Sequence, residues 1–376
     1  MRILFSCRPA YGHLFPLVPL ARAAGEAGHD VVFATGLGFV DRVRALGFEA
    51  HAAGISVAEA ETEARTRHPG ADVVTVLVAM FADVLPRATL AGLAPLLPRV
   101  RPDLVVYEQS DVGAAKAARD AGIPFVSHVI GRSMPPEVQA AAAEHMAWLW
   151  DEQPADLMLG DAVIDLWPDT VRDPQVLKVS TVIRQRPAPF DLDVPMPEIP
   201  SGRPLVYLTL GTVAFVNTAV LRAAVEGLAR LPVHVLVAVG PGDPALLGEV
   251  PGNVTVAAFV PQASVLRRAA LVVHHGGTGT TLGSLATGLP QLVLPQLVLP
   301  QGADQFVNAD VLVETGAGAK LVGPEVTADA VETAARRLLG DDAAKRVALT
   351  AAAEIADMPD PAAVVQRLTE LVRGRA

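Results

Sequence analysis

The sequence predicts an α/β protein made of two doubly wound domains, each built on a parallel sheet. In the first half of the chain, short β-rich runs alternate with helical patterns, and the same alternation restarts in the second half after a proline-rich stretch. Strands that alternate with helices of this length are typical of βαβ units, which form parallel sheets. Two such sheets joined by a linker should face each other across a cleft, where ligands tend to bind.

The first half should hold a sheet whose strands are β-rich and buried. We expect strands at residues 3–7, 30–35, 103–108 and 124–129. Between the first two strands, a helical pattern runs over residues 14–27 and ends at Gly28. Pro16 would lie in the first turn of that helix, where proline is tolerated.

The second half repeats the pattern with strands expected at residues 205–210, 233–239, 254–260 and 271–274. Thr327 is a plausible N-cap for the helical tail, which ends in an amphipathic helix over residues 364–373. That last helix either caps the second domain or crosses back to the first. The predicted division is therefore a first domain at 1–190, a linker at 191–203 within the proline-rich stretch, a second domain at 204–358 and a terminal helix at 359–376.

Length and composition narrow the class of protein. The chain has 376 residues, which suggests about two domains, and its net charge of −10 argues against binding to nucleic acid. Cys7 is the single cysteine and the histidines are scattered, so no disulfide scaffold or metal site is expected. No apolar run approaches the roughly 20 residues that cross a bilayer, and the N-terminus does not resemble a signal peptide. We therefore expect a soluble cytoplasmic protein, monomeric or homodimeric.

The segment LVVHHGGTGTTLG, from Leu271 to Gly283, is the strongest local signal in the chain. A strand enters a glycine-dense loop and a helix follows, so backbone N–H groups and the helix dipole could hold a phosphate. His275 and the threonine hydroxyls could donate hydrogen bonds to its oxygens. The alternative is a tight turn with threonine N-caps. Gly211 and Thr212, after the first strand of the second half, form a weaker phosphate candidate that could equally be an ordinary turn.

His13 follows the first strand where a helix should begin, at the carboxyl edge of the sheet. A histidine there can act as a general base, although a structural or capping role is at least as common. Such a base needs a carboxylate to orient it. Glu108 ends the strand at 103–108 and Asp111 follows three residues later, so either could serve, while Asp111 also suits an N-cap.

Two further groups of residues suit a sugar and an apolar acceptor. Asp304 and Gln305 open a helix, and paired carboxylate and amide groups suit sugar hydroxyls, although helix capping is as good an explanation. The apolar stretch from Asp72 to Val100 contains Phe81, and Trp148 lies further on. Such residues more often belong to a core, but they are also the best candidates for the wall of an acceptor pocket.

Taken together, these motifs resemble those of the inverting GT-B glycosyltransferases of family 1. The carrying segments are RPAYGHLFPLVPLARAAGEAGHDVVFAT, FVPQASVL, HHGGTGT and PQGADQF, which occur in family order over nearly the whole chain. The chain is most similar to actinobacterial enzymes that glycosylate antibiotics, such as those of calicheamicin and related enediyne or polyketide pathways. The resemblance implies the GT-B fold, a nucleotide-sugar donor, an apolar natural-product acceptor and no cofactor or metal.

The resemblance also implies roles for individual residues. His13 matches the general base, with Glu108 or Asp111 as its acid partner. His275, Gly276, Gly277, Thr278, Gly279 and Thr280 match the diphosphate loop, with Gly211 and Thr212 facing it. Residues 260–262, including Val260 and Gln262, match the segment that reads the base. Asp304 and Gln305 match the pair that holds the donor sugar, and Phe81 and Trp148 are the candidate acceptor contacts.

Two departures from the family pattern bear on the donor. Gly283 stands where members that use UDP-sugars commonly carry a glutamate for the ribose hydroxyls, which favours a dTDP-sugar. The five residues PQLVL occur twice in tandem between positions 290 and 301, which places Asp304 five residues further from His275 than the pattern requires. The alternatives are a nucleotide-sugar epimerase on the same fold, or an inactive transferase-like auxiliary protein.

Overall fold

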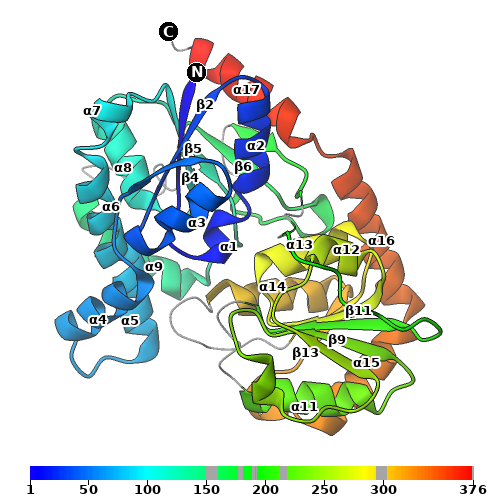
Figure 1. Cartoon of the computed structure of the whole chain (residues 1–376). Helices are drawn as coiled ribbons and strands as arrows, with labels where there is room; N and C mark the ends of the chain where they lie inside the picture. Colours follow the sequence, from blue (N-terminus) through cyan, green and yellow to red (C-terminus); the bar gives the residue numbers. More distant parts are fainter. Residues whose placement is uncertain are drawn as a thin grey trace. The chain divides into compact units, whose positions relative to one another are not determined.

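The structure is a computed structural model, and it separates into two compact units (Figure 1). It describes residues 1–149, 160–176, 181–188, 191, 193–211, 218–293 and 303–374. Thr212 and most of the doubled PQLVL segment therefore lie outside the described residues. Unit 1 consists of Met1–Leu166, Asp173–Arg186 and Met358–Ala376, and unit 2 of Trp167–Arg172 and Pro187–Asp357.

Unit 1 is built on a seven-stranded parallel sheet with the order β3-β2-β1-β4-β5-β6-β7. Its strands are β1 (Arg2–Ser6), β2 (Asp30–Thr35), β3 (Glu49–Ala52), β4 (Leu104–Glu108), β5 (Phe125–His128), β6 (Ala162–Asp165) and β7 (Val182–Arg184). Ile3, Leu4 and Phe5 of β1 are all fully buried. A strand buried on both faces needs helices on both sides of the sheet, as the predicted βαβ alternation supplies.

The helices of unit 1 connect these strands and cover the sheet. They are α1 (Tyr11–Leu14), α2 (Val18–Glu26), α3 (Val40–Ala45), α4 (Val57–Arg67), α5 (Val73–Ala79), α6 (Leu85–Leu93), α7 (Leu97–Val100), α8 (Val112–Asp120), α9 (Pro136–Met146) and α17 (Pro361–Arg373). Short 3-10 turns lie at Leu37–Phe39 and Ala147–Leu149. The single helix expected over 14–27 was wrong in its first turn. The chain forms the short α1, turns at 15–17, and begins α2 at Val18 with Pro19 in the first turn.

A long helical segment runs from Val73 to Leu93 and contains a π-helical turn, η2 (Met80–Val84). The expectation that no apolar run approaches the length of a membrane span was wrong here, because this segment is long and apolar enough by length and composition. Its most apolar window is nevertheless 56% buried inside the protein. Val78 and Ala82 pack into the same core as Leu4 and Val105, which is typical of a core helix in a soluble protein.

Unit 2 contains a six-stranded parallel sheet with the order β10-β9-β8-β11-β12-β13. Its strands are β8 (Leu205–Thr209), β9 (His234–Ala238), β10 (Val254–Ala257), β11 (Ala269–His274), β12 (Gln291–Val293) and β13 (Gly318–Lys320). Its helices are α11 (Thr218–Ala229), α12 (Gln262–Leu266), α13 (Thr278–Ala286), α14 (Ala303–Glu314), α15 (Ala328–Leu339) and α16 (Asp342–Asp357), with short 3-10 turns at Asp169–Val171, Pro244–Leu247 and Gly323–Glu325. Two parallel-sheet α/β domains are thus confirmed, and Thr327 is the N-cap of α15 as expected.

Two segments at the boundaries of the predicted domains, the linker and the terminal helix, each pack on one of the two units. The segment expected as a linker at 191–203 packs on unit 2, where Met196 and Ile199 lie against a core cluster. The chain returns to unit 1 at Met358, so that α17 packs beside α2 (Figure 1). Val364, Val365 and Leu368 are the buried side chains of this last helix.

Candidate active site

The strand orders of the two sheets place a topological switch point in each unit. In unit 1 the chain runs outward from β1 in one direction and from β4 in the other, and in unit 2 it does so from β8 and β11. Ligands of open α/β sheets bind outside the carboxyl ends of the strands at such a switch point. His13 and Glu108 follow β1 and β4, and Gly211 and His275 follow β8 and β11. Topology alone therefore brings the predicted residues together in pairs.

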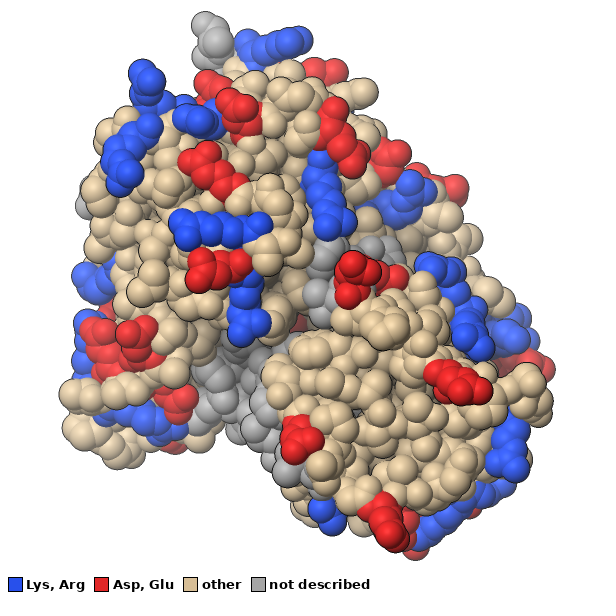
Figure 2. Space-filling model, viewed as in Figure 1, with Lys and Arg blue, Asp and Glu red and all other residues tan. Residues whose placement is uncertain are grey.

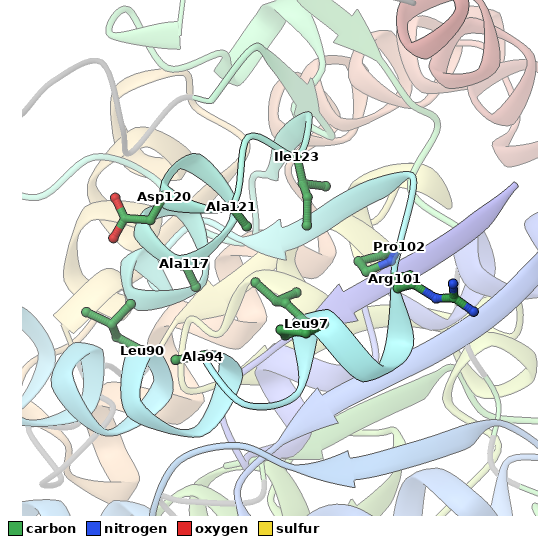
Figure 3. A pocket seen from close by; sticks show the side chains of 10 residues that line it. Leu90, Ala94, Leu97, Arg101, Pro102, Ala117, Asp120, Ala121 and Ile123 are labelled. Carbon is green, nitrogen blue, oxygen red and sulfur yellow. The ribbon is translucent and has the colours of Figure 1, made fainter.

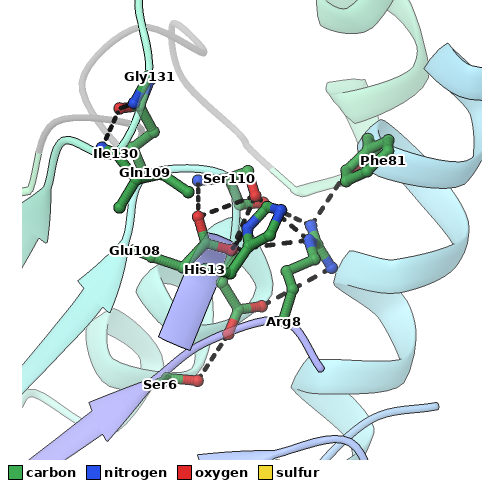
Figure 4. Close-up of polar contacts among 10 residues, drawn as sticks. Ser6, Arg8, His13, Phe81, Glu108, Gln109, Ser110, Ile130 and Gly131 are labelled. Carbon is green, nitrogen blue, oxygen red and sulfur yellow. Dashed lines mark hydrogen bonds and ion pairs between the residues drawn. The ribbon is translucent and has the colours of Figure 1, made fainter. Parts of the chain in front are cut away.

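His13 and Glu108 form a hydrogen-bonded pair at the switch point of unit 1 (Figure 4). His13 donates from Nδ1 to Oε1 of Glu108 at 3.0 Å. Because an ionised carboxylate only accepts, this bond puts the proton of a neutral imidazole on Nδ1 and leaves a lone pair on Nε2. The side chain of His13 is 13% exposed, whereas that of Glu108 is fully buried. Within the described ranges, Nε2 of His13 has no hydrogen-bond partner.

Glu108 is held by donors on both of its oxygens. Ser110 donates its backbone N–H to Oε2 at 2.8 Å, and its hydroxyl lies within 2.9 Å of both oxygens. Burial by itself raises the pKa of Glu108, but His13, the nearby guanidinium of Arg8 and the Ser110 hydroxyl together lower it to about 2. The carboxylate is therefore ionised at neutral pH, as a group that must orient and stabilise an imidazolium has to be.

Asp111, the other candidate partner, points to a different set of groups. Its Oδ2 accepts from the Ser6 hydroxyl at 2.6 Å, and its Oδ1 lies 3.9 Å from Nη1 of Arg8. Asp111 occupies the N-cap position of α8, but its side chain makes no capping hydrogen bond. Burial raises its pKa. The structure thus pairs Glu108, and not Asp111, with His13.

The two candidate acceptor contacts lie in different surroundings. Phe81 is in the π-helical turn, and its ring faces that of His13 with the centroids 6.5 Å apart and the planes 16° from parallel. Trp148 packs against the core of unit 1, and the guanidinium of Arg87 lies 3.7 Å over its ring. Phe81 is thus placed beside the dyad, while the role of Trp148 in acceptor binding stays a prediction.

The glycine loop of unit 2 is packed around the ring of His275. Gly211 has φ +71° and Gly276 has φ +93°, conformations that favour glycine. A Cβ at Gly211 or at Gly277 would overlap the His275 ring, so both positions need glycine for the ring to lie there. Burial lowers the pKa of His275 to about 4, which keeps the imidazole neutral.

His274, the first histidine of the pair, has a structural role that the sequence reasoning missed. Its Nδ1 accepts from the N–H of Gly276 at 3.1 Å, and its Nε2 donates to Oε1 of Gln291 at 2.9 Å. Burial lowers its pKa to about 3. His274 is the last residue of β11 and bonds to Gly276 and Gln291, whereas the ring of His275, the next residue, packs against Gly211 and Gly277 in the loop.

Asp304 reaches the same loop from the start of α14. Its Oδ2 accepts from the hydroxyl of Thr278 at 2.9 Å and from the amide of Asn308 at 3.2 Å. Asn308 also donates to the carbonyl oxygen of Gly276 at 2.8 Å. Gln305 is buried beside them, and Gly279 and Thr280 lie in the first turn of α13. Hydrogen bonds therefore connect α14 to the glycine loop, although the doubled PQLVL precedes this helix.

The segment expected to read the nucleobase lies at the start of α12. Val260 is buried in the core, and Gln262 accepts a hydrogen bond from the hydroxyl of Tyr207 at 3.4 Å. Asp191, from the predicted linker, accepts from the N–H of Ala263 at 2.7 Å and so caps this helix. A Cβ at Gly283 would lie 2.9 Å from the side chain of Leu266 on α12, so a larger residue there must displace it.

Three further features concern a pocket away from His13, the surface charge and possible metal ligands. A pocket of about 530 Å³ is lined by residues of α6, α7 and α8, including Leu90, Leu97 and Ala117 (Figure 3). Pro102 and Ile123, which also line it, precede β4 and β5, so this pocket is at the amino edge of the sheet, opposite His13. On the face shown in Figure 2, Lys and Arg side chains are interspersed with Asp and Glu. In the part of the chain that the structure describes, no three His, Cys, Asp or Glu residues gather as a metal site would require.

Comparison with known proteins agrees with this geometry. Residues 222–371 match the family described as erythromycin biosynthesis protein CIII-like, C-terminal domain. The chain is 33% identical to the L-demethylnoviosyl transferase of Streptomyces niveus, with 98% of this chain and 97% of that protein covered. It is 30% identical to the elloramycin glycosyltransferase ElmGT of Streptomyces olivaceus, over 98% and 97% of the two chains.

The fold is shared with a solved glycosyltransferase. The crystal structure of SsfS6 from Streptomyces sp. SF2575, complexed with thymidine diphosphate, has a TM-score of 0.77 and 25% identity, and covers 98% of this chain and 99% of that one. With its two parallel-sheet domains and its full-length similarity to antibiotic transferases, this chain belongs to the family 1 natural-product glycosyltransferases of the GT-B fold and is a glycosyltransferase.

Proposed function

We propose that this enzyme is an inverting glycosyltransferase that moves a deoxysugar from a dTDP-sugar to a hydroxyl of an apolar natural-product aglycone. The observation that carries the proposal is the pair of His13 and Glu108. A buried, ionised carboxylate fixes Nδ1 of the imidazole and leaves Nε2 as the basic atom. A general base needs this orientation, with a free lone pair directed at the acceptor.

In the proposed reaction, Nε2 of His13 takes the proton of the acceptor hydroxyl as its oxygen attacks the anomeric carbon of the donor. The new glycosidic C–O bond forms on one face while the bond from the anomeric carbon to the diphosphate oxygen breaks on the other. The electron pair of that bond leaves with the nucleoside diphosphate, and the anomeric configuration inverts. Glu108 stabilises the imidazolium that forms, as the carboxylate does in other acid–histidine pairs.

The leaving diphosphate would be stabilised by the glycine loop of unit 2. The N-terminus of α13 presents backbone N–H groups, and the single N–H of a neutral His275 goes either to the backbone carbonyl of Thr209 or to the diphosphate. Among the described residues, Nδ1 of His275 is buried without a hydrogen-bond partner, which supports a role toward a ligand. In this proposal no cofactor or metal takes part, and the enzyme is cytoplasmic.

The dTDP assignment rests on Gly283, which carries no side chain that could bind a ribose hydroxyl and whose ideal Cβ would lie 2.9 Å from a methyl group of Leu266. The solved relative SsfS6 was crystallised with thymidine diphosphate, which supports the same choice. Calorimetric titration of the purified enzyme with dTDP and with UDP tests it, and tighter dTDP binding is expected. Equal or tighter UDP binding would contradict the dTDP assignment. Binding of neither would leave the auxiliary-protein alternative.

The role of His13 is tested by varying the acidity of the acceptor. A base matters most for an aliphatic alcohol and least for a nitrophenol that is already ionised at neutral pH. His13→Ala should therefore lose about 10²–10⁴-fold in kcat/KM with an alcohol and much less with the nitrophenol. A uniform loss across acceptors would assign His13 a structural role, and near wild-type turnover of the alcohol would exclude it as the base.

A further inference from the structure

Arg8 is a buried arginine that none of the proposed catalytic steps uses. It lies just beyond the carboxyl end of β1 and is 2% exposed. A guanidinium in the interior is costly unless it is paired and its donors are satisfied. Its partners therefore indicate what it is for.

The guanidinium of Arg8 contacts two separate segments around the pair of His13 and Glu108, residues 108–111 and Phe81 (Figure 4). Its Nε lies 4.0 Å from Oε1 of Glu108, and its Nη1 lies 3.9 Å from Oδ1 of Asp111. Its Nη2 donates to the backbone carbonyl of Ser110, the residue whose N–H and hydroxyl hold Glu108. The planar fork of donors on an arginine suits such simultaneous contacts, and a lysine could make only part of them.

The contact with the second segment is to Phe81, the candidate acceptor contact. Nη2 of Arg8 also donates to the carbonyl oxygen of Phe81 at 3.3 Å, and the guanidinium lies 5.6 Å from the centroid of the Phe81 ring. Phe81 sits in the π-helical turn, a rare geometry that is frequent at functional sites. The side chain of Arg8 thus contacts both Glu108, which orients His13, and Phe81, whose ring faces the imidazole.

We propose that Arg8 is a positioning residue that keeps the His13–Glu108 pair in its working charge state and fixes Phe81 beside it as a wall of the acceptor site. This inference deepens the proposed function and rests on it. With Arg8 present, its positive charge offsets one of the two neighbouring carboxylates. Without it, Glu108 and Asp111 face the imidazole alone and favour its protonated form, which cannot accept a proton.

The other titratable groups near the pair do not replace this charge. Burial has the largest effect on the pKa of Cys7, Tyr107 and His128, and the charge of Glu108 also acts on each of them. Burial raises the pKa of Cys7 and Tyr107 and lowers that of His128 to about 4, so all three are neutral at pH 7. Among the described residues named above, Arg8 is then the permanent cation beside the pair of His13 and Glu108.

Two variants separate the charge of Arg8 from its geometry. Arg8→Met removes both, and Arg8→Lys keeps the charge but loses the fork. Arg2→Met is the matched control, because Arg2 lies at the other end of the same strand and donates to the carbonyl of Val100. Each protein is assayed for kcat/KM against pH and for the acceptor KM, with an aliphatic alcohol as acceptor and thermal stability and dTDP affinity measured alongside.

Arg8→Met should move the acid limb of the pH profile to higher pH by about one unit, the effect of removing one charge within roughly 10 Å at an effective dielectric constant near 20. It should also raise the acceptor KM several-fold. Arg8→Lys should restore the acid limb but not the KM, and Arg2→Met should change neither. A lower stability of Arg8→Met with an unchanged acid limb and KM would overturn the inference and leave Arg8 a structural residue.

If Arg8→Met does not fold, Arg8→Lys alone decides the geometric part, because an unchanged acceptor KM in that variant overturns it. Failure of the inference differs from failure of the proposed function. If His13→Ala shows no selective loss with the alcohol acceptor, the base assignment fails and the inference falls with it. If that selective loss is seen but the Arg8 variants behave as the control does, only the role of Arg8 is wrong.

Discussion

Replacing Glu108 by glutamine tests the central pair most directly. The wild-type carboxylate accepts from His13 on Oε1 and from Ser110 on both oxygens. A glutamine offers one oxygen and one NH₂ group. If its oxygen keeps the Ser110 N–H, its NH₂ group faces Nδ1 of His13 and donates to it. The imidazole then carries its proton on Nε2, where the base must have none.

The size of the effect follows from the distance and from burial. Opposite unit charges 3.0 Å apart interact with roughly 5 kcal/mol at an effective dielectric constant near 20. The amide dipole of a glutamine retains part of this. We therefore expect the imidazolium of the transition state to lose about 3–5 kcal/mol, which corresponds to a fall in kcat of roughly 10²–10⁴-fold.

The assay is the initial rate of dTDP release from a dTDP-sugar with an aliphatic alcohol as acceptor. Thermal denaturation and dTDP affinity show whether the variant is folded and its donor unit intact. Asp111→Asn is the comparison, because that side chain is buried nearby and leaves the bond between His13 and Glu108 in place. Asp111→Asn should lose less activity than Glu108→Gln.

Two results would refute the reasoning. A folded Glu108→Gln enzyme within about tenfold of the wild-type rate would mean that the carboxylate neither orients nor stabilises His13. A larger loss for Asp111→Asn than for Glu108→Gln, with both proteins folded, would make Asp111 the functional partner.

Three further outcomes follow from the packing and the buried histidines. Gly113→Ala should lower the free energy of unfolding by about 1–3 kcal/mol, because the new Cβ would overlap a backbone carbonyl of α6. Gly25→Ala should not lower it, because no atom lies near the position of that Cβ. Thermal denaturation compares the two variants. His274 has a pKa of about 3 in the folded protein against about 6.5 in the unfolded chain, so the free energy of unfolding falls as pH drops below 6.5, by about 2 kcal/mol at pH 5. Amide exchange in β11, corrected for the intrinsic rate, should therefore be faster at pH 5 than at pH 7. An unchanged rate would contradict this prediction. Gly277→Ala should push the ring of His275 aside and weaken dTDP binding at least about tenfold by calorimetry, and an unchanged affinity would remove that ring from the binding site.

Periodicity and strand signals were enough to predict both sheets, because buried parallel strands are apolar along their whole length. Short strands such as β3, β12 and β13 escaped, since three or four residues carry too little pattern. The break between α1 and α2 was also missed. Nothing in the helical period of residues 14–27 shows that the chain must turn after Leu14 to place His13 at the strand end.

In the site, the position of His13 followed from its place after a strand, but the choice between Glu108 and Asp111 did not. The two acids are three residues apart, and only the turn made by Ser110 sends one toward His13 and the other toward Ser6. Arg8 could have been singled out from the sequence, because it is a charged residue directly after a strand predicted to be buried, but this pattern was not interpreted.

The donor side had signals of the same kind. Asn308 stands four residues after Asp304, one helical turn along α14, so helical spacing could have placed both side chains on the same face. The roles of His274 and His275 were not separated from the sequence, and which of the two lines the loop needed the structure.

The path of the last helix has a consequence for how this protein can be made and rebuilt. In unit 1, α17 is synthesised after all the other described elements, yet its side chains pack against α2, which is among the first of them. Unit 1 therefore cannot reach its final packing until α17 has left the ribosome. For the same reason, a chimaera that exchanges the N-terminal half between two such enzymes must exchange residues 358–376 with it. A chimaera joined only at residue 187 would pack α17 of one enzyme against α2 of the other.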